Sequence, residues 1–387
     1  MTTRIINLLK YFLSIFFSFV LPIKNKRIVL WSTEGNNYSC NPRAMAEYLQ
    51  AHPELGFDVY FAFKKGRVSK ECELRSLIIG SLDYLIKINT SEFLFTNHRT
   101  TSPRSFFWRK RMKQKYIMSW HGSMPLKMIE KDTINTLGVK YEKVAKKDSN
   151  RCNLMLSDNE WFSKTIRRAF WYDGPIFETG IPRNDVFYNV EKRNAAIAKV
   201  YTNYNISSEC SIVLYAPTFR TNHSLDAYVK DWDDCLEVFE KMLGKEIVLL
   251  TRLHPGMIGD KTFVIKSNQF RIIDATLYDE MQELLVTADI LVTDFSSTMF
   301  EFSLLKKPCF LVASDLYSYD RNLYFPLDKL PYKKYSDIYE LAKELPKISI
   351  NEYIKEQSSF VNKVFSPIYD PNTSEKLTNW LLINSNK

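Results

Sequence analysis

Two histidines stand where predicted strands end, each followed by a residue that stops a strand. The first lies in Trp120-His121-Gly122 and the second in Arg252-Leu253-His254-Pro255. An ordinary histidine has a pKa of about 6.5 and can accept a hydroxyl proton near neutral pH. A core histidine bonded to a carbonyl group is the plainer interpretation of each. Because both stand at strand ends, the sequence favours catalytic roles, with His121 as a general base.

Anion-binding residues accompany these histidines. Arg252 and His254 are two apart on an extended chain, so their side chains share one face and can clamp an anion. The segment 293–298 precedes a predicted helix, whose free amides and positive dipole end would receive a phosphate, although serine and threonine also serve as ordinary helix caps. The predicted phosphate site comprises Arg220, Arg252, Asp294, Ser296, Ser297 and Thr298.

A metal site is not predicted. Asp231-Trp232-Asp233 resembles an acid pair that could hold a divalent ion, but it lies at the start of a predicted helix over 232–243, where acids favour the helix dipole. The six cysteines form no Cys-x-x-Cys pair and are expected to be free thiols. Walker-type and Gly-x-Gly-x-x-Gly loops are absent from the sequence.

Short apolar runs alternate with helical patterns along the chain, which predicts an α/β fold with parallel sheets. The predicted strands cover residues 27–31, 58–63, 92–96, 116–120 and 153–157 in the first half, and 212–216, 246–250, 271–273, 290–293 and 309–312 in the second. A polar, weakly patterned run at 188–208 separates the halves. We therefore expect two doubly wound, Rossmann-like domains of the glycosyltransferase-B type: an acceptor-side domain at 27–190 and a donor-binding domain at 205–387, with ligands beyond the carboxyl ends of the strands.

The N-terminal segment 1–26 is strongly apolar between Arg4 and Lys24. A cleaved signal peptide would need a small-residue cleavage site, and a spanning helix about 20 apolar residues. We expect instead a membrane-associating helix in the interface, with Lys24, Lys26 and Arg27 at the lipid headgroups. A helix buried against the protein or in a dimer is the alternative.

The formal net charge of +9 suits an anionic membrane or a phosphorylated substrate. Nucleic acid is not expected as a partner, because the basic residues form no stripe and no nucleic-acid-binding motif is found.

Taken in order, the motifs resemble the CDP-glycerol glycerophosphotransferase family of teichoic acid and capsule assembly. The residues that carry the resemblance are Asn41-Pro42-Arg43, Trp120-His121-Gly122, Pro125-Leu126-Lys127, Thr179-Gly180-Ile181-Pro182-Arg183-Asn184-Asp185, Tyr215-Ala216-Pro217-Thr218-Phe219-Arg220, Arg252-Leu253-His254-Pro255 and Thr293-Asp294-Phe295-Ser296-Ser297. The resemblance covers most of residues 27–345.

This resemblance implies transfer of glycerol phosphate from CDP-glycerol to a hydroxyl of a lipid-linked acceptor, with release of CMP and without a cofactor. It also implies peripheral attachment to the cytoplasmic face of the bacterial cell membrane, with anionic lipids as partners. His121 matches the family's base, and His254 matches the donor phosphate site together with Arg252, Arg220, Ser296 and Ser297. The acceptor side is expected to include Gly122, Lys127, Arg183, Asn184 and Asp185.

Two departures from the family's pattern concern the substrate pockets. Ser123-Met124 stands where one residue is expected, and Leu330-Pro331-Tyr332-Lys333-Lys334 replaces a Pro-Gly-Pro turn. Three other functions stay open: a CDP-ribitol-using transferase, a glycosyltransferase that uses a nucleotide sugar, and a non-catalytic assembly scaffold.

Overall fold

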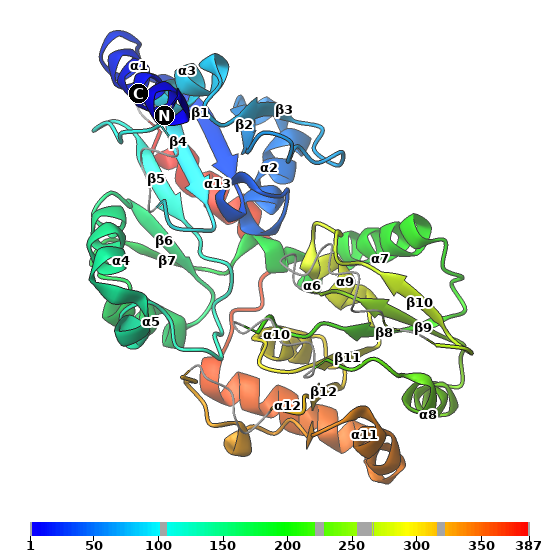
Figure 1. Ribbon diagram of the computed structural model, residues 1–387. Helices are drawn as coiled ribbons and strands as arrows, with labels where there is room; N and C mark the ends of the chain where they lie inside the picture. Colours follow the sequence, from blue (N-terminus) through cyan, green and yellow to red (C-terminus); the bar gives the residue numbers. More distant parts are fainter. Residues whose placement is uncertain are drawn as a thin grey trace. The chain divides into compact units, whose positions relative to one another are not determined.

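The protein divides into two compact units, each built on one parallel sheet. The computed structural model describes residues 2–100, 107–220, 228–253, 265, 267–315 and 322–385 (Figure 1). Unit 1 contains Met1–Ser123, Ile129–Tyr188 and Pro367–Lys387, and unit 2 contains Met124–Met128 and Asn189–Ser366. These two units, each with one parallel sheet, confirm the predicted α/β class with two parallel-sheet domains.

Unit 1 has a seven-stranded sheet in the order β3-β2-β1-β4-β5-β6-β7, and every neighbouring pair is parallel. Its strands are β1 (Lys24–Trp31), β2 (Asp58–Phe63), β3 (Arg75–Ile78), β4 (Ser91–Thr96), β5 (Lys115–Met118), β6 (Leu154–Ser157) and β7 (Ile176–Glu178). The strand order reverses between β1 and β4. Ligands of doubly wound sheets bind beyond the carboxyl ends of the strands at such a reversal.

Helices cover both faces of this sheet, because alternate strand residues point to opposite faces and both sets are apolar. The helices are α1 (Thr2–Val20), α2 (Cys40–Ala51), α3 (Leu82–Thr90), α4 (Ile134–Ser149), α5 (Glu160–Ala169), α6 (Asp185–Tyr188) and α13 (Thr373–Ile383). Val29 and Leu94 pack with residues of α3 and α5 on one face. Ile28 and Phe93 pack with residues of α2 and α13 on the other.

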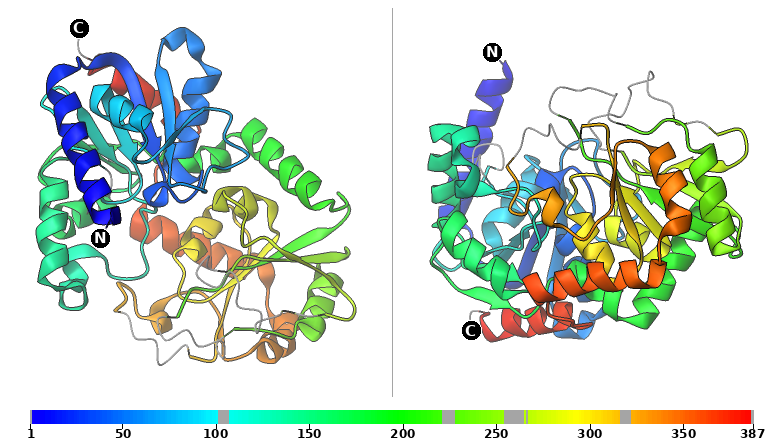
Figure 2. Two further views of the ribbon diagram at one scale, coloured as in Figure 1. Left: turned by 45° about the horizontal axis from the view of Figure 1, so that its top comes forward. Right: turned by 90° about the horizontal axis from the view of Figure 1, so that it is seen from below.

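Helix α13 comes from the far end of the chain and completes unit 1 (Figures 1 and 2). Asp185 holds its first turn: one carboxylate oxygen accepts from the backbone N of Thr373 (3.1 Å), and the other accepts from the backbone N (3.1 Å) and hydroxyl (2.7 Å) of Ser374. Gly180 has a φ of +123°, and a Cβ there would stand 2.4 Å from the Thr373 hydroxyl. The prediction that 205–387 forms one domain is therefore wrong for residues 367–387, whose apolar helix face completes the other core.

Replacing Asp185 with alanine is expected to lower the free energy of unfolding by about 2–3 kcal/mol, because three donors at the start of α13 lose an ionised acceptor. Urea denaturation followed by circular dichroism measures this change. Asp173, an exposed acid of the same unit, is the matched control, and Asp173→Ala should leave stability unchanged. Equal stability of the two variants would show that the carboxylate is not what holds α13.

Unit 2 has a six-stranded parallel sheet in the order β10-β9-β8-β11-β12-β13. Its strands are β8 (Ser211–Tyr215), β9 (Ile247–Thr251), β10 (Arg271–Asp274), β11 (Ile290–Thr293), β12 (Cys309–Val312) and β13 (Lys334–Tyr335). Its helices are α7 (Val190–Tyr204), α8 (Asp233–Leu243), α9 (Met281–Thr287), α10 (Thr298–Leu304), α11 (Ile338–Glu344) and α12 (Ile350–Phe365). Residues of α8 and α11 pack on one face of the sheet. The order reverses between β8 and β11.

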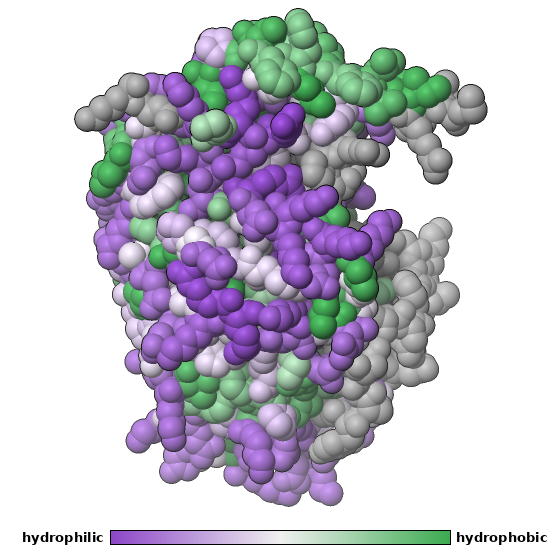
Figure 3. Space-filling model, turned by 90° about the vertical axis from the view of Figure 1, so that its left-hand side faces the viewer, coloured by the Kyte–Doolittle hydropathy of each residue, from purple (hydrophilic) through white to green (hydrophobic). Residues whose placement is uncertain are grey.

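Helix α1 packs on unit 1 through Tyr11, Phe17 and the buried Ser14, and most of its large apolar residues face outward. Ser14 is buried and donates to the carbonyl oxygen of Phe107, and Asn89 donates to the Ser14 hydroxyl (2.6 Å). The outward residues are Ile5, Ile6, Leu8, Leu9, Phe12, Leu13, Phe16, Phe19 and Val20, all exposed. Figure 3 shows this hydrophobic surface at the top of the view. None of the helices in the described part of the chain is long and apolar enough to cross a membrane.

One detail of the predicted N-terminal segment is wrong. Arg27 does not reach outward with Lys24, because β1 already begins at Lys24 and buries the Arg27 side chain. Its guanidinium bonds Asp58 (2.7 Å) and Thr90 (2.7 Å). Arg27 therefore belongs to the interior of unit 1.

Candidate active site

His121 follows β5 in unit 1, and a strained turn presents its ring. Trp120 has a φ of +55°, in the left-handed region that bulky residues avoid, and Asn41 donates to its carbonyl oxygen (3.1 Å). The Nδ1 atom of His121 lies 3.2 Å from the carbonyl oxygen of Asn97. A carbonyl oxygen can only accept, so Nδ1 carries the proton in the neutral ring and Nε2 keeps its lone pair. The residue is exposed, so this geometry suits a general base.

Desolvation lowers the pKa of His121 well below its ordinary value, and the neighbouring His98 and Arg183 act in the same direction. The residue as a whole is nevertheless accessible to solvent. The neutral, proton-accepting form therefore persists at pH values below the usual imidazole range.

His98 is a residue of this site that sequence reasoning missed. It follows β4, beside the reversal of strand order, and its ring stacks on that of His121 with centroids 4.4 Å apart and planes 10° apart. The side-chain oxygen of Asn97 lies 3.1 Å from Nδ1 of His98 and accepts from the backbone N of Thr33 (2.9 Å). Burial lowers the pKa of His98 to about 4. The available signal was a second histidine directly after an apolar strand.

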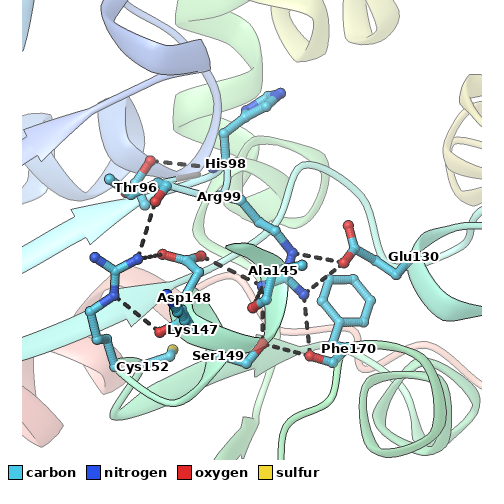
Figure 4. Close-up of polar contacts among 12 residues, drawn as sticks. Thr96, His98, Arg99, Glu130, Ala145, Lys147, Asp148, Ser149, Cys152 and Phe170 are labelled. Carbon is cyan, nitrogen blue, oxygen red and sulfur yellow. Dashed lines mark hydrogen bonds and ion pairs between the residues drawn. The ribbon is translucent and has the colours of Figure 1, made fainter. Parts of the chain in front are cut away.

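A buried ionic network fixes the chain next to His98 (Figure 4). Arg99 pairs with Glu130 (2.7 Å) and Asp148 (3.5 Å), and all three side chains are almost fully buried. Its guanidinium also donates to the Ser149 hydroxyl (3.0 Å) and to the carbonyl oxygens of Ala145 (3.1 Å) and Phe170 (3.2 Å). The His98 ring points away from this network in Figure 4. Arg99 thus anchors the backbone from which His98 reaches His121.

Replacing His98 with alanine is expected to lower kcat about 10-fold or more, because His121 loses the ring that fixes its plane and small misplacements of catalytic groups are costly. His98→Phe keeps a stacked ring and should restore most of the rate. The acidic limb of the pH profile should move to higher pH in both variants, because a group that lowers the pKa of His121 is gone. A wild-type rate and pH profile in His98→Ala would contradict this role.

The other predicted acceptor-side residues of unit 1 separate into two groups. Gly122 and Arg183 lie by His121: a Cβ on Gly122 would stand 3.5 Å from the Arg183 guanidinium, and the backbone N of Arg183 donates to Asn41 (3.0 Å). Asn184 is buried in the turn Pro182–Asn184, and Asp185 binds the start of α13. Among the predicted acceptor-side residues, Arg183 is therefore the one whose positive charge lowers the pKa of His121.

Lys127 lies in unit 2, although the sequence predicts it on the acceptor side. Its segment, Met124–Met128, forms an antiparallel bridge from Lys127 to Leu323, and Leu126 donates its backbone N to the Ser297 hydroxyl (3.0 Å). Lys127 thus shares a unit with the predicted phosphate residues.

Arg252 follows β9 in unit 2 and has an available donor. Its Nη1 atom is buried and has no hydrogen-bond partner among the residues that the structure describes. Desolvation lowers its pKa, whereas Glu280 and Asp279 act in the opposite direction. A buried guanidinium nitrogen with an unused donor is suited to bind an anion. His254, its predicted partner, lies outside the described residues.

Arg220 and Asp294 form an ion pair at the ends of β8 and β11 (2.9 Å), and Arg220 also makes a two-pronged contact with Asp315 (2.6 and 2.8 Å). Desolvation lowers the pKa of Arg220, but these carboxylates outweigh it and raise the pKa. Asp294 also accepts from the backbone N of Thr218 (2.8 Å). The Asp294 carboxylate thus holds Arg220 and the turn at Thr218, and the roles of both residues in binding phosphate stay predictions.

Ser296, Ser297 and Thr298 stand together where β11 leads into α10. The Thr298 hydroxyl donates to that of Ser296 (2.7 Å), and Ser297 is the N-cap residue, although its side chain makes no capping bond. All three residues are partly accessible. Their roles as phosphate ligands remain predictions.

The sequence profile of the family described as "CDP-Glycerol:Poly(glycerophosphate) glycerophosphotransferase" matches residues 13–383. The chain is 31% identical over 340 residues to a teichoic acid poly(glycerol phosphate) polymerase of Staphylococcus epidermidis, covering 84% of this chain but only 46% of that protein. It therefore spans about half the length of that relative.

A second relative has nearly the same length as this chain. It is a teichoic acid glycerol-phosphate transferase of Staphylococcus aureus, 28% identical over 378 residues, with 93% of this chain and 94% of that protein covered. Among solved structures, a variant of the wall teichoic acid polymerase TagF soaked with CDPG has a TM-score of 0.82 and 27% identity, covering 97% of this chain and 93% of that one.

Proposed function

Because this chain belongs to the CDP-glycerol:poly(glycerophosphate) glycerophosphotransferase family, we propose that it transfers glycerol phosphate from CDP-glycerol to a hydroxyl of a lipid-linked acceptor. CMP is the second product. The observation that carries this proposal is the His121 ring, whose Nδ1 is held by a carbonyl oxygen so that Nε2 accepts a proton. The relatives of S. epidermidis and S. aureus, both named for glycerol phosphate, support the choice of polyol.

The proposed reaction is a single displacement at phosphorus. The acceptor oxygen attacks the phosphorus that carries glycerol, its proton passes to Nε2 of His121, and the bond from that phosphorus to the bridging oxygen breaks. The electron pair of this bond leaves with CMP. Positioning and electrostatic stabilisation supply most of the rate in such phosphoryl transfers.

Unit 2 supplies the charge that the departing phosphate needs. Arg252 offers its buried Nη1, and Ser296, Ser297 and Thr298 offer hydroxyl groups. His254 in its protonated form is the predicted partner of Arg252. Because cationic side chains can neutralise this charge, the proposed reaction needs no metal ion.

The experiment that tests this function measures nucleotide release by the purified protein in EDTA. The donors are CDP-glycerol, CDP-ribitol and common nucleotide sugars, with a short glycerophosphate lipid as acceptor. CMP is expected from CDP-glycerol alone. Release from CDP-ribitol or a nucleotide sugar would assign another donor, and restoration of activity only by added Mg²⁺ would contradict the metal-independent mechanism.

We also propose that α1 attaches the protein to the cytoplasmic face of the bacterial cell membrane. Nine large apolar side chains of α1 are exposed, whereas its inward side carries buried Ser14 and Ser18. Such an arrangement suits a helix lying in the membrane interface. A lipid-linked acceptor would then be reached from the membrane surface.

A further inference from the structure

A pocket of about 670 Å³ opens where α1 ends on unit 1. We call it the α1-end pocket. Phe19, Ile23 and Met112 contribute apolar groups to it, and Arg109, Lys110 and Lys113 contribute basic ones. Phe19 is 75% exposed, and Met112 is fully exposed. The pocket therefore continues the outward apolar side of α1 and adds a cluster of positive charge to it.

Contacts within unit 1 hold the basic loop against the end of α1. Arg111 donates from Nη1 to the carbonyl oxygens of Leu21 (2.8 Å) and Asn89 (2.8 Å). Gln114 donates to the carbonyl oxygens of Ile88 (2.8 Å) and Ser91 (2.9 Å). Arg111 and Gln114 thus fix the loop that carries Arg109 and Lys110.

Arg109 and Lys110 supply the positive charge on which the further argument depends. Neither Arg109 nor Lys110 forms an ion pair with an acid in the described part of the chain, and the positive charges of Arg151 and Lys115 repel that of Lys110. Half-burial lowers the pKa of Lys110. An anion bound there would offset both the repulsion and the desolvation.

The combination of groups selects an amphiphilic anion. A free phosphate would satisfy Arg109 and Lys110 but leave Phe19, Ile23 and Met112 facing water. The headgroup phosphate of a phospholipid satisfies the cations, and its acyl chains cover the apolar groups and run on along the outward side of α1. Charge complementarity selects an anionic phospholipid over a zwitterionic one.

We propose that the α1-end pocket binds the headgroup of an anionic phospholipid of the phosphatidylglycerol type, with its acyl chains against Phe19, Ile23 and Met112. This inference rests on the proposed membrane attachment of α1. It adds a defined headgroup site to that attachment.

Co-sedimentation of the full chain with vesicles tests the proposal. Vesicles of phosphatidylcholine alone are compared with vesicles that also contain phosphatidylglycerol. The double variant Arg109→Ala/Lys110→Ala should bind the anionic vesicles about 10- to 30-fold more weakly, at the usual contribution of a basic residue near an anionic surface. The matched control is Lys65→Ala/Lys70→Ala, which removes two exposed lysines between β2 and β3 and should bind like the wild type.

Two further measurements separate a lipid site from general charge attraction. Soluble dihexanoyl-phosphatidylglycerol should displace the protein from anionic vesicles, whereas inorganic phosphate at the same concentration should not. The exposed Met112→Asp variant should lose anionic-vesicle binding while keeping its circular dichroism spectrum. Equal weakening of both double variants, equal competition by inorganic phosphate, or unchanged binding of Met112→Asp would overturn the proposal.

The variants also separate the headgroup site from the membrane attachment of α1, on which it rests. They separate it from the enzymatic function as well. Phe12→Ser/Phe16→Ser should weaken binding to both vesicle types, because it removes outward apolar area from α1. Wild-type protein that binds both vesicle types equally would remove the headgroup site and leave the attachment standing. The Arg109→Ala/Lys110→Ala variant should keep its transfer rate on a water-soluble acceptor.

Discussion

Replacing His121 with alanine is expected to lower kcat by about 10²–10⁴-fold, the usual contribution of a positioned general base. The Michaelis constant for the donor should change little, because the predicted phosphate ligands are in unit 2 and His121 is in unit 1. Steady-state measurement of CMP release gives both constants. The matched control is His52→Ala, which removes another histidine of unit 1, one that stacks on Tyr48 at the end of α2.

The pH profile supplies an independent measurement of the same role. Activity requires neutral His121, so it should be lost as the pH falls through the pKa of this residue in the folded protein. Since desolvation, His98 and Arg183 lower that pKa, the acidic limb should lie below about pH 6.5, the ordinary value of histidine. A limb at or above that pH, or full activity of His121→Ala, would show that another group takes the proton.

Replacing Arg252 with glutamine is expected to lower kcat/KM for CDP-glycerol by about 10–100-fold, the range that corresponds to losing a hydrogen bond to a charged group. The buried Nη1 atom is the donor that this change removes. Arg252→Lys keeps the charge but loses the planar fork, so it should recover only part of the loss. Calorimetric titration with CMP should show the same order of affinities.

Exposed Arg271 provides the comparison for Arg252. It is an arginine of unit 2 that donates to the backbone carbonyls of Asn205 (2.8 Å) and Tyr204 (2.6 Å). Arg271→Gln should bind CMP like the wild type. If Arg252→Gln also binds CMP normally, the anion site is elsewhere in unit 2.

The central strands were predictable because each is a short run of buried apolar residues bounded by polar turns. Every residue of β8 is buried, for example, and so is every residue of β11. The sequence pattern did not predict β3, β7 and β13, which lie at edges of the two sheets. The remaining edge strand, β10, was predicted. The three unpredicted strands are short and partly exposed, so they carry no continuous apolar pattern.

The positions of candidate residues were predictable where they follow strongly apolar strands, as His121 and Arg252 do. The partners of those residues were not, because they come from distant parts of the sequence. Asp315 binds Arg220 from 95 residues away, and Asp294 does so from the end of another strand. His98 was missed because only the fold brings the ends of β4 and β5 together. The packing of α13 on unit 1 likewise involves Asp185 and Gly180. Neither residue type indicates in the sequence that a distant helix will pack against it.

The late position of α13 sets a constraint on biosynthesis. Leu377 and Leu381 cover one face of the unit 1 sheet, yet the ribosome adds them only after the whole of Asn189–Ser366. At translation rates of roughly 5–20 residues per second, that face stays uncovered in the nascent chain for on the order of ten seconds or more. The first unit to be synthesised is thus the last to close, and an apolar surface is offered to chaperones throughout that interval.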